Sequence, residues 1–422
     1  MGSYRRRIID TTLDELQPHL RALSIHGPKG VGKTATAMQR ARSVVDLSLA
    51  SQRQIVRADP STLTSLPGPV LVDEWQRLPE VWDHIRHAVD GGSPPGHFII
   101  AGSSTPRGAV VHSGAGRIVP MRMRPLSLAE REVESPTVSV ANLLEAGGDI
   151  AGSSQLRLAD YVEEITASGF PAIRQLPARV RRAELDAYLA NVVQREFPEQ
   201  GYVVRKPESL RAWLAAYAAA TSSTTAYTKI LDAATAGIQD KPAKETTLSY
   251  RDALSSLWLL DPTPAWIPGH NHLDRLAQSP KHQLADPALA ARLLGLDAPA
   301  LLRAEQGSTR LTEGTILGAL FEHLAALSLH VYAEAAEARV YHLRTRNGDH
   351  EVDFIVQRPD GCILAIEVKL ADRVDDADVR HLAWLKNKVG GDLIDAVVVY
   401  AGEYAYRRRD GIAVVPLALL GP

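Results

Sequence analysis

A glycine-rich segment near the N-terminus carries the strongest chemical signal in the sequence. In chain order it consists of Gly27, Pro28, Lys29, Gly30, Val31, Gly32, Lys33 and Thr34. It fits the pattern G-x-x-x-x-G-K-[ST], follows an apolar run and precedes a helix-forming one. The glycines let backbone N–H groups face phosphate oxygens, while the Lys33 ammonium can reach the β- and γ-phosphates and the Thr34 hydroxyl can ligate Mg²⁺. The segment predicts a site for ATP and its magnesium ion.

Two acidic residues end a second apolar run, further along the chain. The run Val70–Val72 is followed directly by Asp73 and Glu74. A buried strand that ends this way places both carboxylates at the edge of the sheet where open α/β folds bind ligands. We expect Asp73 to hold Mg²⁺ through water, and Glu74 to act on the attacking water as a general base or as an orienting group.

Polar residues after a third apolar run are weaker candidates for the same site. The run HFIIAG ends in Ser103 and Ser104, and Ser103 could hydrogen-bond the γ-phosphate or the attacking water. A simple turn at the end of a strand is the alternative interpretation. Arg117 is a candidate for stabilising the transition state, in its own subunit or in a neighbour's. Arg122 and Arg124 alternate with methionines, which also fits the polar face of a strand.

A second group of chemistry-bearing residues lies near the C-terminus. Asp353 occurs in EVDFIV, and Glu367 and Lys369 occur in AIEVK, with a Pro-Asp-Gly turn between the two runs. In a hairpin Glu367 and Lys369 share one face, and Asp353 can meet them from the neighbouring strand. Carboxylates that hold Mg²⁺ beside a lysine suit phosphodiester hydrolysis, and Glu322 on a preceding helix could add a metal ligand. The alternative is that these charges lie on exposed faces of the hairpin.

The elements that position these residues follow from the hydrophobic pattern. Short apolar runs alternate with helix-forming segments in the first part of the chain, which predicts a parallel sheet covered by helices. The expected strands are 22–27, 43–48, 68–75 and 97–104. The middle of the chain is Ala-rich and helical, and the helices expected at 209–223, 224–237 and 243–260 fit either a winged helix-turn-helix or a plain bundle.

The last part of the chain returns to an α/β pattern. A helix is expected at 315–335, three strands within 339–369, a helix at 376–389 and a strand at 395–400. The expected organisation is therefore an α/β protein of three domains, covering residues 1–150, 151–270 and 271–422.

Composition limits the classes of protein to which the chain can belong. With 422 residues, 45% apolar and 23% charged, it is neither disordered nor fibrous, and its net charge of −2 argues against binding nucleic acid or membranes through bulk charge. The single cysteine, Cys362, cannot form an internal disulfide, which fits a reducing compartment. We find no apolar run of the roughly 18 residues that a membrane span needs and no secretory leader, so a cytoplasmic protein without a membrane partner is expected.

The chain resembles a family of bacterial and archaeal AAA-type ATPases. The resemblance rests on GPKGVGKT, VLVDEWQRLPEVWDHIRHAVD, FIIAGSS, HSGAGRIVPMRMRPLSLAE, SPKHQLADPALAARLLG and GALFEHLAA. It implies an ATP-binding core, a winged-helix-like middle and a C-terminal domain of unknown function. ATP is then expected at Gly27–Thr34, Asp73 and Glu74.

The C-terminal residues resemble a second group, the PD-(D/E)xK nuclease superfamily. Glu322, Asp353, Glu367 and Lys369 match its helix acid, strand acid and E-x-K, although Val352 stands where a proline is usual. Together the two resemblances imply a magnesium-dependent ATPase coupled to a nuclease-like domain that acts on DNA. The alternative is a nucleotide-dependent regulator or protein-interaction switch whose degenerate nuclease fold does not cleave nucleic acid. A homo-oligomer and a protein partner stay open.

Overall fold

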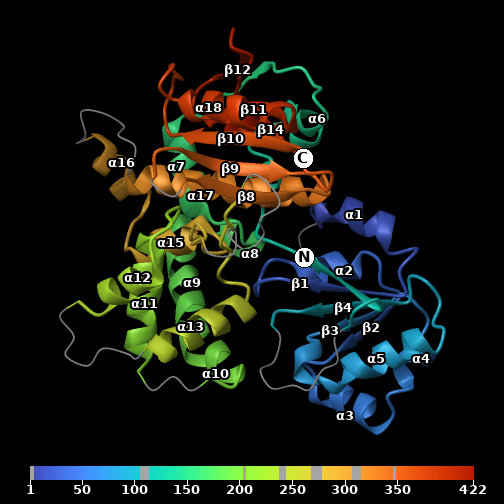
Figure 1. Ribbon diagram of the computed structural model, residues 1–422. Helices are drawn as coiled ribbons and strands as arrows, with labels where there is room; N and C mark the ends of the chain where they lie inside the picture. The colour runs from blue at the N-terminus through green and yellow to red at the C-terminus, as the bar shows by residue number, and fades with distance from the viewer. Residues whose placement is uncertain are drawn as a thin grey trace.

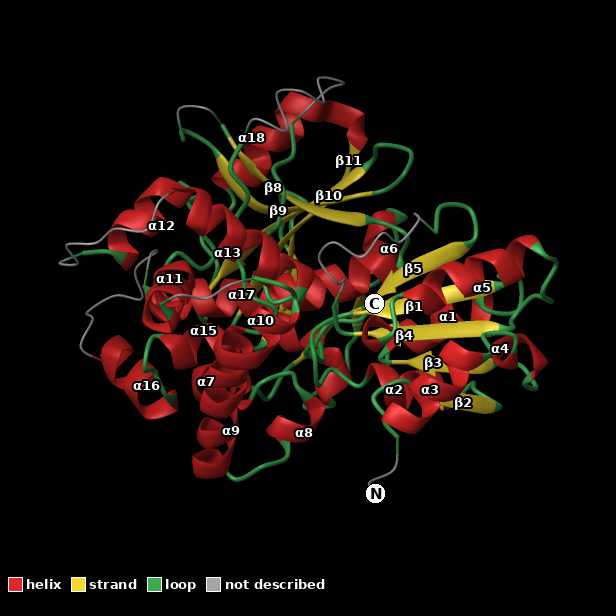
Figure 2. Cartoon of the chain, turned by 90° about the horizontal axis from the view of Figure 1, so that it is seen from below, coloured by secondary structure: helices red, strands yellow, loops and turns green. Residues whose placement is uncertain are grey.

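The computed structural model describes residues 4–104, 114–202, 206–236, 244–267, 278–306, 315–345 and 348–422. The first part of the chain and the last part each form a sheet with helices, and the middle part is helical (Figure 1). Seen from below, the two sheets lie apart, with helices of the middle part beside them (Figure 2).

The N-terminal sheet has five parallel strands in the order β2-β3-β4-β1-β5. Its strands are β1 (Ala22–His26), β2 (Ser43–Asp46), β3 (Val70–Asp73), β4 (Phe98–Gly102) and β5 (Ile118–Arg122). The apolar runs in β1, β3 and β4 are buried throughout, because helices cover both faces of the sheet. One face packs against α1 (Ile9–Leu16) and α2 (Lys33–Met38), the other against α3 (Ala50–Ala58), α4 (Thr62–Ser65) and α5 (Glu80–Asp90).

Strand order decides which residues meet at the edge of this sheet. Strand β4 lies between β1 and β3, with His26 level with Gly102 and Asp73 level with Ala101. The three strands therefore end together, and the segments that follow them share one edge. The four predicted strands are confirmed, and β5 is the strand that the alternation around Arg122 indicated as one of two interpretations.

The middle part consists of helices followed by a short antiparallel pairing. Its helices are α7 (Leu158–Ala167), α8 (Pro171–Arg174), α9 (Ala178–Asn191), a π-helical turn (Val192–Glu196), α10 (Phe197–Glu199), α11 (Pro207–Ala219), α12 (Tyr227–Ala234), α13 (Lys244–Ser256), α15 (Pro287–Leu293) and α16 (Ala298–Gln306). After α13, Leu260 pairs with Leu284 and Thr263 pairs with Lys281 in antiparallel bridges. We call residues 259–265 and 281–285 the ribbon.

The C-terminal part is a mixed sheet in the order β7-β12-β13-β11-β10-β9-β8. The strands are β7 (Gly152–Ser153), β8 (Arg339–Arg344), β9 (Glu351–Gln357), β10 (Ile363–Lys369), β11 (Leu393–Tyr400), β12 (Tyr404–Arg407) and β13 (Ala413–Pro416). Strands β8, β9 and β10 are antiparallel neighbours, and β10 is parallel to β11. Helix α17 (Ile316–Ala335) packs on one face and α18 (Arg380–Val389) on the other.

Residues 138–153 lie against the C-terminal sheet, although the prediction assigned most of them to the first domain. Strand β7 pairs with β12, and β6 (Val138–Ser139) pairs with β14 (Leu420–Gly421). The short helix α6 (Val140–Leu144) contacts β10 and β11. Strands of two residues have no periodicity to read, so these pairings are visible only in three dimensions.

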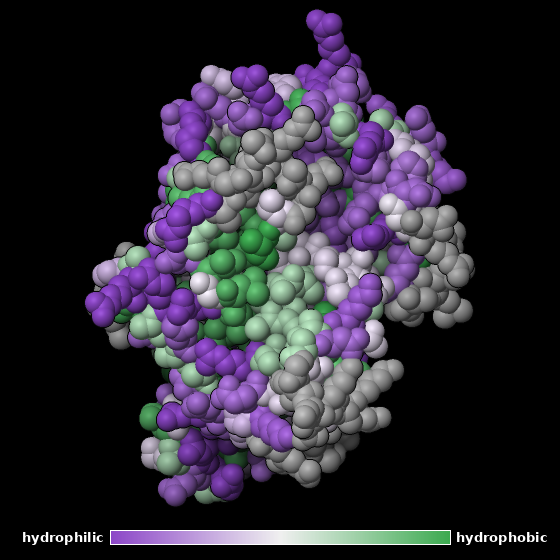
Figure 3. Space-filling model, turned by 90° about the vertical axis from the view of Figure 1, so that its left-hand side faces the viewer, coloured by the Kyte–Doolittle hydropathy of each residue, from purple (hydrophilic) through white to green (hydrophobic). Residues whose placement is uncertain are grey.

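Helix α17 corrects the expectation that the chain has no apolar segment of spanning length. Its 20 residues reach a mean hydropathy of 1.4 over an 18-residue window, enough to cross a membrane by length and composition alone. Of that window 67% is buried inside the protein, as in the core helix of a globular fold. Figure 3 shows the side of the molecule that lies on the left in Figure 1, where apolar residues gather in a patch bordered by hydrophilic ones.

Candidate functional site

The phosphate loop, Gly27–Thr34, joins β1 to α2 as the motif requires. Gly30 and Gly32 have φ values of 88° and 102°, a region that favours glycine. Gly27 is needed for a different reason, since a Cβ there would lie 2.0 Å from the carbonyl oxygen of Met123. The loop is thus packed tightly against the segment that follows β5.

Lys33 is buried and turned toward its own loop. Its Nζ donates hydrogen bonds to the Gly27 carbonyl at 2.8 Å and to the Pro28 carbonyl at 2.9 Å. Burial lowers the pKa of Lys33 to about 8, although Glu74 and Asp73 act in the opposite direction. Phosphate oxygens would restore a full ionic partner to this ammonium group, which neutral carbonyls cannot supply.

Thr34 and Asp73 supply oxygen donors next to the loop. The Thr34 hydroxyl donates to the Asp73 carboxylate at 2.8 Å across the gap between α2 and β3. Burial raises the pKa of Asp73, while the hydrogen bonds from Thr34 and the Glu74 N–H lower it. A hydroxyl and a carboxylate are the hard oxygen ligands that Mg²⁺ takes beside nucleotide phosphates, so these residues fit the ion.

Glu74 and Ser103 are joined by a residue that the sequence did not single out. The Gln76 side-chain amide donates to Glu74 Oε2 at 2.7 Å and to Ser103 Oγ at 3.1 Å. Glu74 adopts φ 53°, a strained backbone region for a non-glycine residue. Burial raises the pKa of Glu74, and the neighbouring Asp73 carboxylate raises it further. A lone glutamine carries no motif, so only the fold reveals its position.

The middle helices close over this edge of the sheet. Tyr188 Oη donates to the Lys29 carbonyl at 3.2 Å, and Glu196 of the π-helical turn lies 3.5 Å from Lys29 Nζ. Gln200 donates to Ser104 Oγ at 2.8 Å. The cavity between these groups measures about 60 Å³, far below the roughly 300 Å³ of a small-molecule pocket. The middle helices thus leave little open space beside Glu74 and Ser103.

Arg117 does not reach the phosphate loop of its own chain. It directly precedes Ile118, which pairs with Ala22 at the start of β1, whereas the loop follows the other end of β1. Its Nε lies 2.9 Å from Asp90 Oδ1, and the side chain is half exposed. Arg117 therefore cannot stabilise the transition state in its own subunit, one of the two roles considered for it. The reason is that the parallel strands put Arg117 at the opposite edge of the sheet. A role in a neighbouring subunit stays a prediction.

The C-terminal carboxylates converge as the hairpin predicted. Asp353 on β9 and Glu367 on β10 come from antiparallel neighbouring strands. The Val368 N–H donates to Asp353 Oδ2 at 2.9 Å, and Lys369 Nζ lies 3.6 Å from Glu367 Oε2. Burial raises the pKa of Glu367 well above its usual range, and Asp353 adds to the effect.

A lysine from the ribbon occupies the middle of this cluster. Lys281 Nζ lies 2.7 Å from Asp353 Oδ1, 2.8 Å from Glu322 Oε1 and 3.5 Å from Glu351 Oε1. Its side chain is 1% exposed. The carboxylates raise the pKa of Lys281 against the effect of burial. Lys281 is distant from the cluster in sequence, so no spacing rule could have found it.

This arrangement corrects the prediction that Glu322, Asp353 and Glu367 together hold a metal ion. Within the described ranges, no group of three or more His, Cys, Asp and Glu side chains could hold a metal ion. The physical reason is that an ammonium group lies between the carboxylates of Glu322 and Asp353. We call Glu322, Glu351, Asp353, Glu367, Lys281 and Lys369 the carboxylate cluster.

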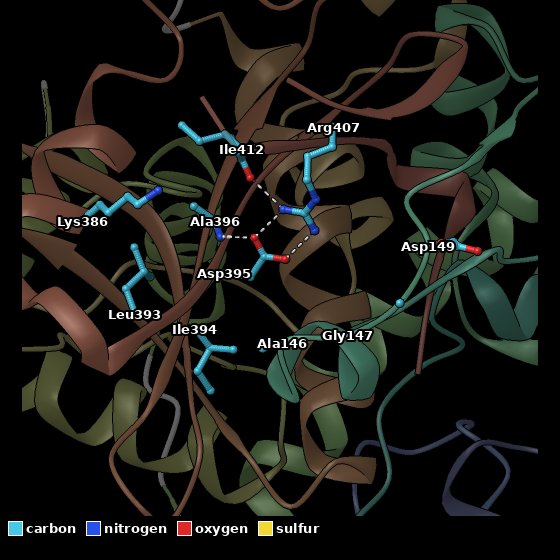
Figure 4. Close-up of a pocket in the computed structure, with 12 residues that line it drawn as sticks. Ala146, Gly147, Asp149, Lys386, Leu393, Ile394, Asp395, Ala396, Arg407 and Ile412 are labelled. Atoms are coloured by element: carbon cyan, nitrogen blue, oxygen red, sulfur yellow. Dashed lines mark hydrogen bonds and ion pairs between the residues drawn. The ribbon is translucent and has the colours of Figure 1, made fainter. Parts of the chain in front are cut away.

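A larger cavity of about 610 Å³ opens elsewhere, between the loop 146–149 and β11. In Figure 4, Arg407 turns toward Asp395, with two contacts of 2.8 Å. This cavity is lined by none of the residues that the sequence analysis singled out.

The five-stranded parallel sheet, the phosphate loop and the Asp73–Glu74 pair define an AAA-type, ATP-binding domain. The family model described as "AAA domain" matches residues 19–132. Two further models, both described as domains of unknown function, match residues 158–300 (DUF8612) and 317–420 (DUF4143).

Relatives extend over most of the chain. Uncharacterized proteins of Mycobacterium tuberculosis and Mycobacterium bovis are each 27% identical over 401 residues, which is 92% of this chain and 78% of each relative. A Walker-type ATPase of Pyrococcus abyssi aligns at 12% identity with a TM-score of 0.40, over 69% of this chain and 96% of its own. The ORC2 protein of Aeropyrum pernix aligns at 15% identity with a TM-score of 0.29, over 71% and 93%.

Proposed function

We propose that the protein is a magnesium-dependent ATPase of the cytoplasm whose nucleotide state acts on the C-terminal domain. The observation that carries the proposal is the shared sheet edge, where the phosphate loop, the Thr34–Asp73 contact and the Glu74–Gln76–Ser103 chain lie together. The backbone N–H groups of the loop and Lys33 bind the phosphates. A Mg²⁺ ion held by Thr34 and Asp73 would neutralise phosphate charge when bound.

Two observations support Glu74, which directly follows β3, as the group that acts on water. Burial and the neighbouring Asp73 raise the pKa of Glu74, which makes its carboxylate a stronger base that can accept a proton from the attacking water or orient it. Gln76 fixes the Glu74 carboxylate against Ser103, which leaves the Ser103 hydroxyl beside the expected place of the γ-phosphate.

Nucleotide titration with a matched variant tests this proposal. Lys33→Ala removes the buried ammonium, so ATP affinity should fall by roughly 10- to 100-fold, the value of a hydrogen bond to a charged group. Lys388→Ala, which removes an exposed lysine from α18, is the control and should leave affinity unchanged. Calorimetry measures both; equal ATP affinity in Lys33→Ala and the parent protein would refute the phosphate-loop assignment.

For the C-terminal domain we favour the switch over the nuclease. The order of β8, β9, β10 and β11 and the convergence of Asp353 with Glu367 support a nuclease-like fold. Lys281, however, neutralises the carboxylates that would hold the metal. Incubating the full chain with linear DNA or RNA and Mg²⁺, with and without ATP, should give no cleavage. Cleavage that disappears in Lys369→Ala would favour the nuclease instead.

The remaining assignments concern partners. Helices α11, α12 and α13 followed by the ribbon support a winged-helix-like middle that could contact DNA or a protein. Arg117 lies half exposed at the sheet edge opposite the phosphate loop, so it could complete the ATP site of a neighbour in a homo-oligomer.

A further inference from the structure

A tight helical turn after Glu74 places an arginine beside the proposed ATP site. The turn covers Trp75–Arg77, and the Arg77 N–H donates to the Glu74 carbonyl at 2.9 Å. Trp75 and Leu78 are each 2% exposed and anchor the turn in the core of the domain. The side chain of Arg77, in contrast, is half exposed. The guanidinium of Arg77 is therefore carried by the same rigid backbone segment as Glu74.

Arg77 borders the same small cavity as Glu74 and Ser103. The cavity, of about 60 Å³, is also lined by Lys29 of the phosphate loop. A water molecule needs roughly 10–15 Å³, so the attacking water fits between these groups. Among the described residues that line the cavity, Arg77 carries the only guanidinium. The turn thus puts an arginine at the place where we expect water and the γ-phosphate to meet.

The charge of Arg77 acts on the expected water-activating group. Burial raises the pKa of Glu74 most, and Asp73 raises it further. Three cations lower it, and these are Lys33, Lys29 and Arg77. The guanidinium is therefore within electrostatic reach of the Glu74 carboxylate. The same charge can stabilise negative charge that develops on phosphoryl oxygens beside Glu74.

The partner of Arg77 in the structure is a carboxylate of the middle helices. Arg77 Nη2 lies 3.2 Å from Glu199 Oε2 on α10, and the two side chains are 43% and 47% exposed. Ion pairs as exposed as this one contribute at most about 1 kcal/mol, so the guanidinium can leave Glu199 for a stronger anionic partner. A phosphoryl group is such a partner, because it accepts two parallel hydrogen bonds from one guanidinium.

We propose that Arg77 stabilises the transition state of ATP hydrolysis within its own subunit, and that Glu199 competes for its guanidinium. The proposal rests on the proposed ATPase function, and it fills the role that Arg117 cannot take in its own chain. In the hydrolysis step, the water oxygen bonds to the γ-phosphorus, the bond to the ADP oxygen breaks, and the water proton passes to Glu74. Arg77 donates hydrogen bonds to the γ-phosphoryl oxygens and exchanges no proton.

Hydrolysis and binding measured on the same variants test the role of Arg77. Arg77→Ala should slow ATP hydrolysis by roughly 10²- to 10³-fold, the cost of removing one donor to the transition state, while ATP affinity stays near that of the parent protein. Arg77→Lys keeps the charge but loses the bidentate geometry, so it should keep ATP affinity and part of the rate. Arg57→Ala, which removes an exposed arginine from α3, is the control and should hydrolyse ATP at the parent rate.

Rescue by free guanidinium separates a catalytic role of Arg77 from a structural one. Guanidinium chloride, far below the concentrations that unfold proteins, should raise the hydrolysis rate of Arg77→Ala several-fold, because the free ion can occupy the place of the missing side chain. The parent protein should not respond, and sodium chloride at the same concentration is the control for ionic strength. A slow Arg77→Ala that guanidinium does not rescue, or that loses ATP affinity as much as rate, overturns the proposal.

Competition by Glu199 predicts a change of the opposite sign. Glu199→Gln frees the guanidinium, so hydrolysis should rise about twofold to fivefold at unchanged ATP affinity, as expected for the loss of an exposed ion pair. The double variant Arg77→Ala with Glu199→Gln should hydrolyse ATP as slowly as Arg77→Ala alone. An equal rise with and without Arg77 would show that Glu199 acts on the site by another route, and the competition would be wrong.

Failure of this proposal can be told from failure of the proposed function. If the parent protein binds and hydrolyses ATP, and Arg77→Ala does so at the same rate, the role of Arg77 is overturned while the ATPase function stands. If the parent protein does not hydrolyse ATP, the proposed function fails and the role of Arg77 fails with it.

Discussion

The phosphate-loop site and the carboxylate cluster both contain a buried lysine and acidic residues, yet only in the first is the lysine available to bind an anion. In each, a buried lysine lies near acidic side chains. Among the described residues, Lys33 donates hydrogen bonds to two loop carbonyls, and burial lowers its pKa to about 8. Lys281 is bonded to carboxylates, and they raise its pKa.

The difference lies in what satisfies the ammonium group. Neutral carbonyls leave Lys33 with unmet charge, so an anionic ligand gains from binding it. Carboxylates already satisfy Lys281, so a metal ion must first displace a buried ion pair. A buried lysine thus leaves charge for an anionic ligand in one domain and is already neutralised by carboxylates in the other.

The largest expected effect separates binding from chemistry at the phosphate-loop site. Glu74→Gln keeps the shape of the side chain but removes its proton-accepting carboxylate. ATP hydrolysis should slow by roughly 10²- to 10⁴-fold while ATP affinity stays near that of the parent protein. Steady-state hydrolysis and nucleotide titration measure the two effects. Turnover that survives intact in Glu74→Gln would show that Glu74 does not act on the water. Glu80→Gln on α5 is the control and should hydrolyse ATP at the rate of the parent protein.

The second effect concerns the carboxylate cluster and its dependence on pH. Burial raises the pKa of Asp353, but Lys281 and Lys369 outweigh it and bring the pKa to about 2, below the ordinary 3.8. Asp353 therefore stabilises the fold above pH 3.8, and this contribution, roughly 2 kcal/mol, is lost as pH falls toward 2. In urea unfolding, Asp353→Asn should lose this part of the acid dependence. Asp149→Asn, at an exposed position, should keep it; identical pH profiles for all three proteins would contradict the ion pair.

A smaller effect tests whether the Glu196 carboxylate weakens ATP binding at the phosphate-loop site. Glu196 lies 3.5 Å from Lys29, where its charge opposes that of a triphosphate. Glu196→Gln should tighten ATP binding by about threefold to tenfold, less at high salt. Glu199→Gln, which instead loses a contact with Arg77, is the matched control. Weaker ATP binding in Glu196→Gln would mean that this carboxylate supports the site.

The smallest effect on the isolated chain is expected at Arg117. Because its partner Asp90 is exposed, Arg117→Ala should leave thermal stability unchanged. If Arg117 acts across a subunit boundary, mixing Arg117→Ala with Lys33→Ala should restore part of the hydrolysis at intact interfaces. Mixed oligomers that form but show no recovery would exclude that role.

The sequence by itself determined the local features of this protein. The phosphate loop, four of the strands of the first sheet and the Asp353–Glu367 hairpin could all be read from motif and periodicity. Each depends on neighbours in the chain, whose spacing sets backbone curvature and the face on which a side chain lies.

Only the tertiary structure decided which of these features are available for chemistry. Strand order put β4 between β1 and β3, so that the segments after all three share one edge, and it placed Arg117 at the opposite edge of the sheet. Gln76 and Lys281 reach their partners through backbone geometry and long-range packing that no spacing encodes. Burial then set the charges, because an ion pair in a dry interior excludes what the same carboxylates would bind in water.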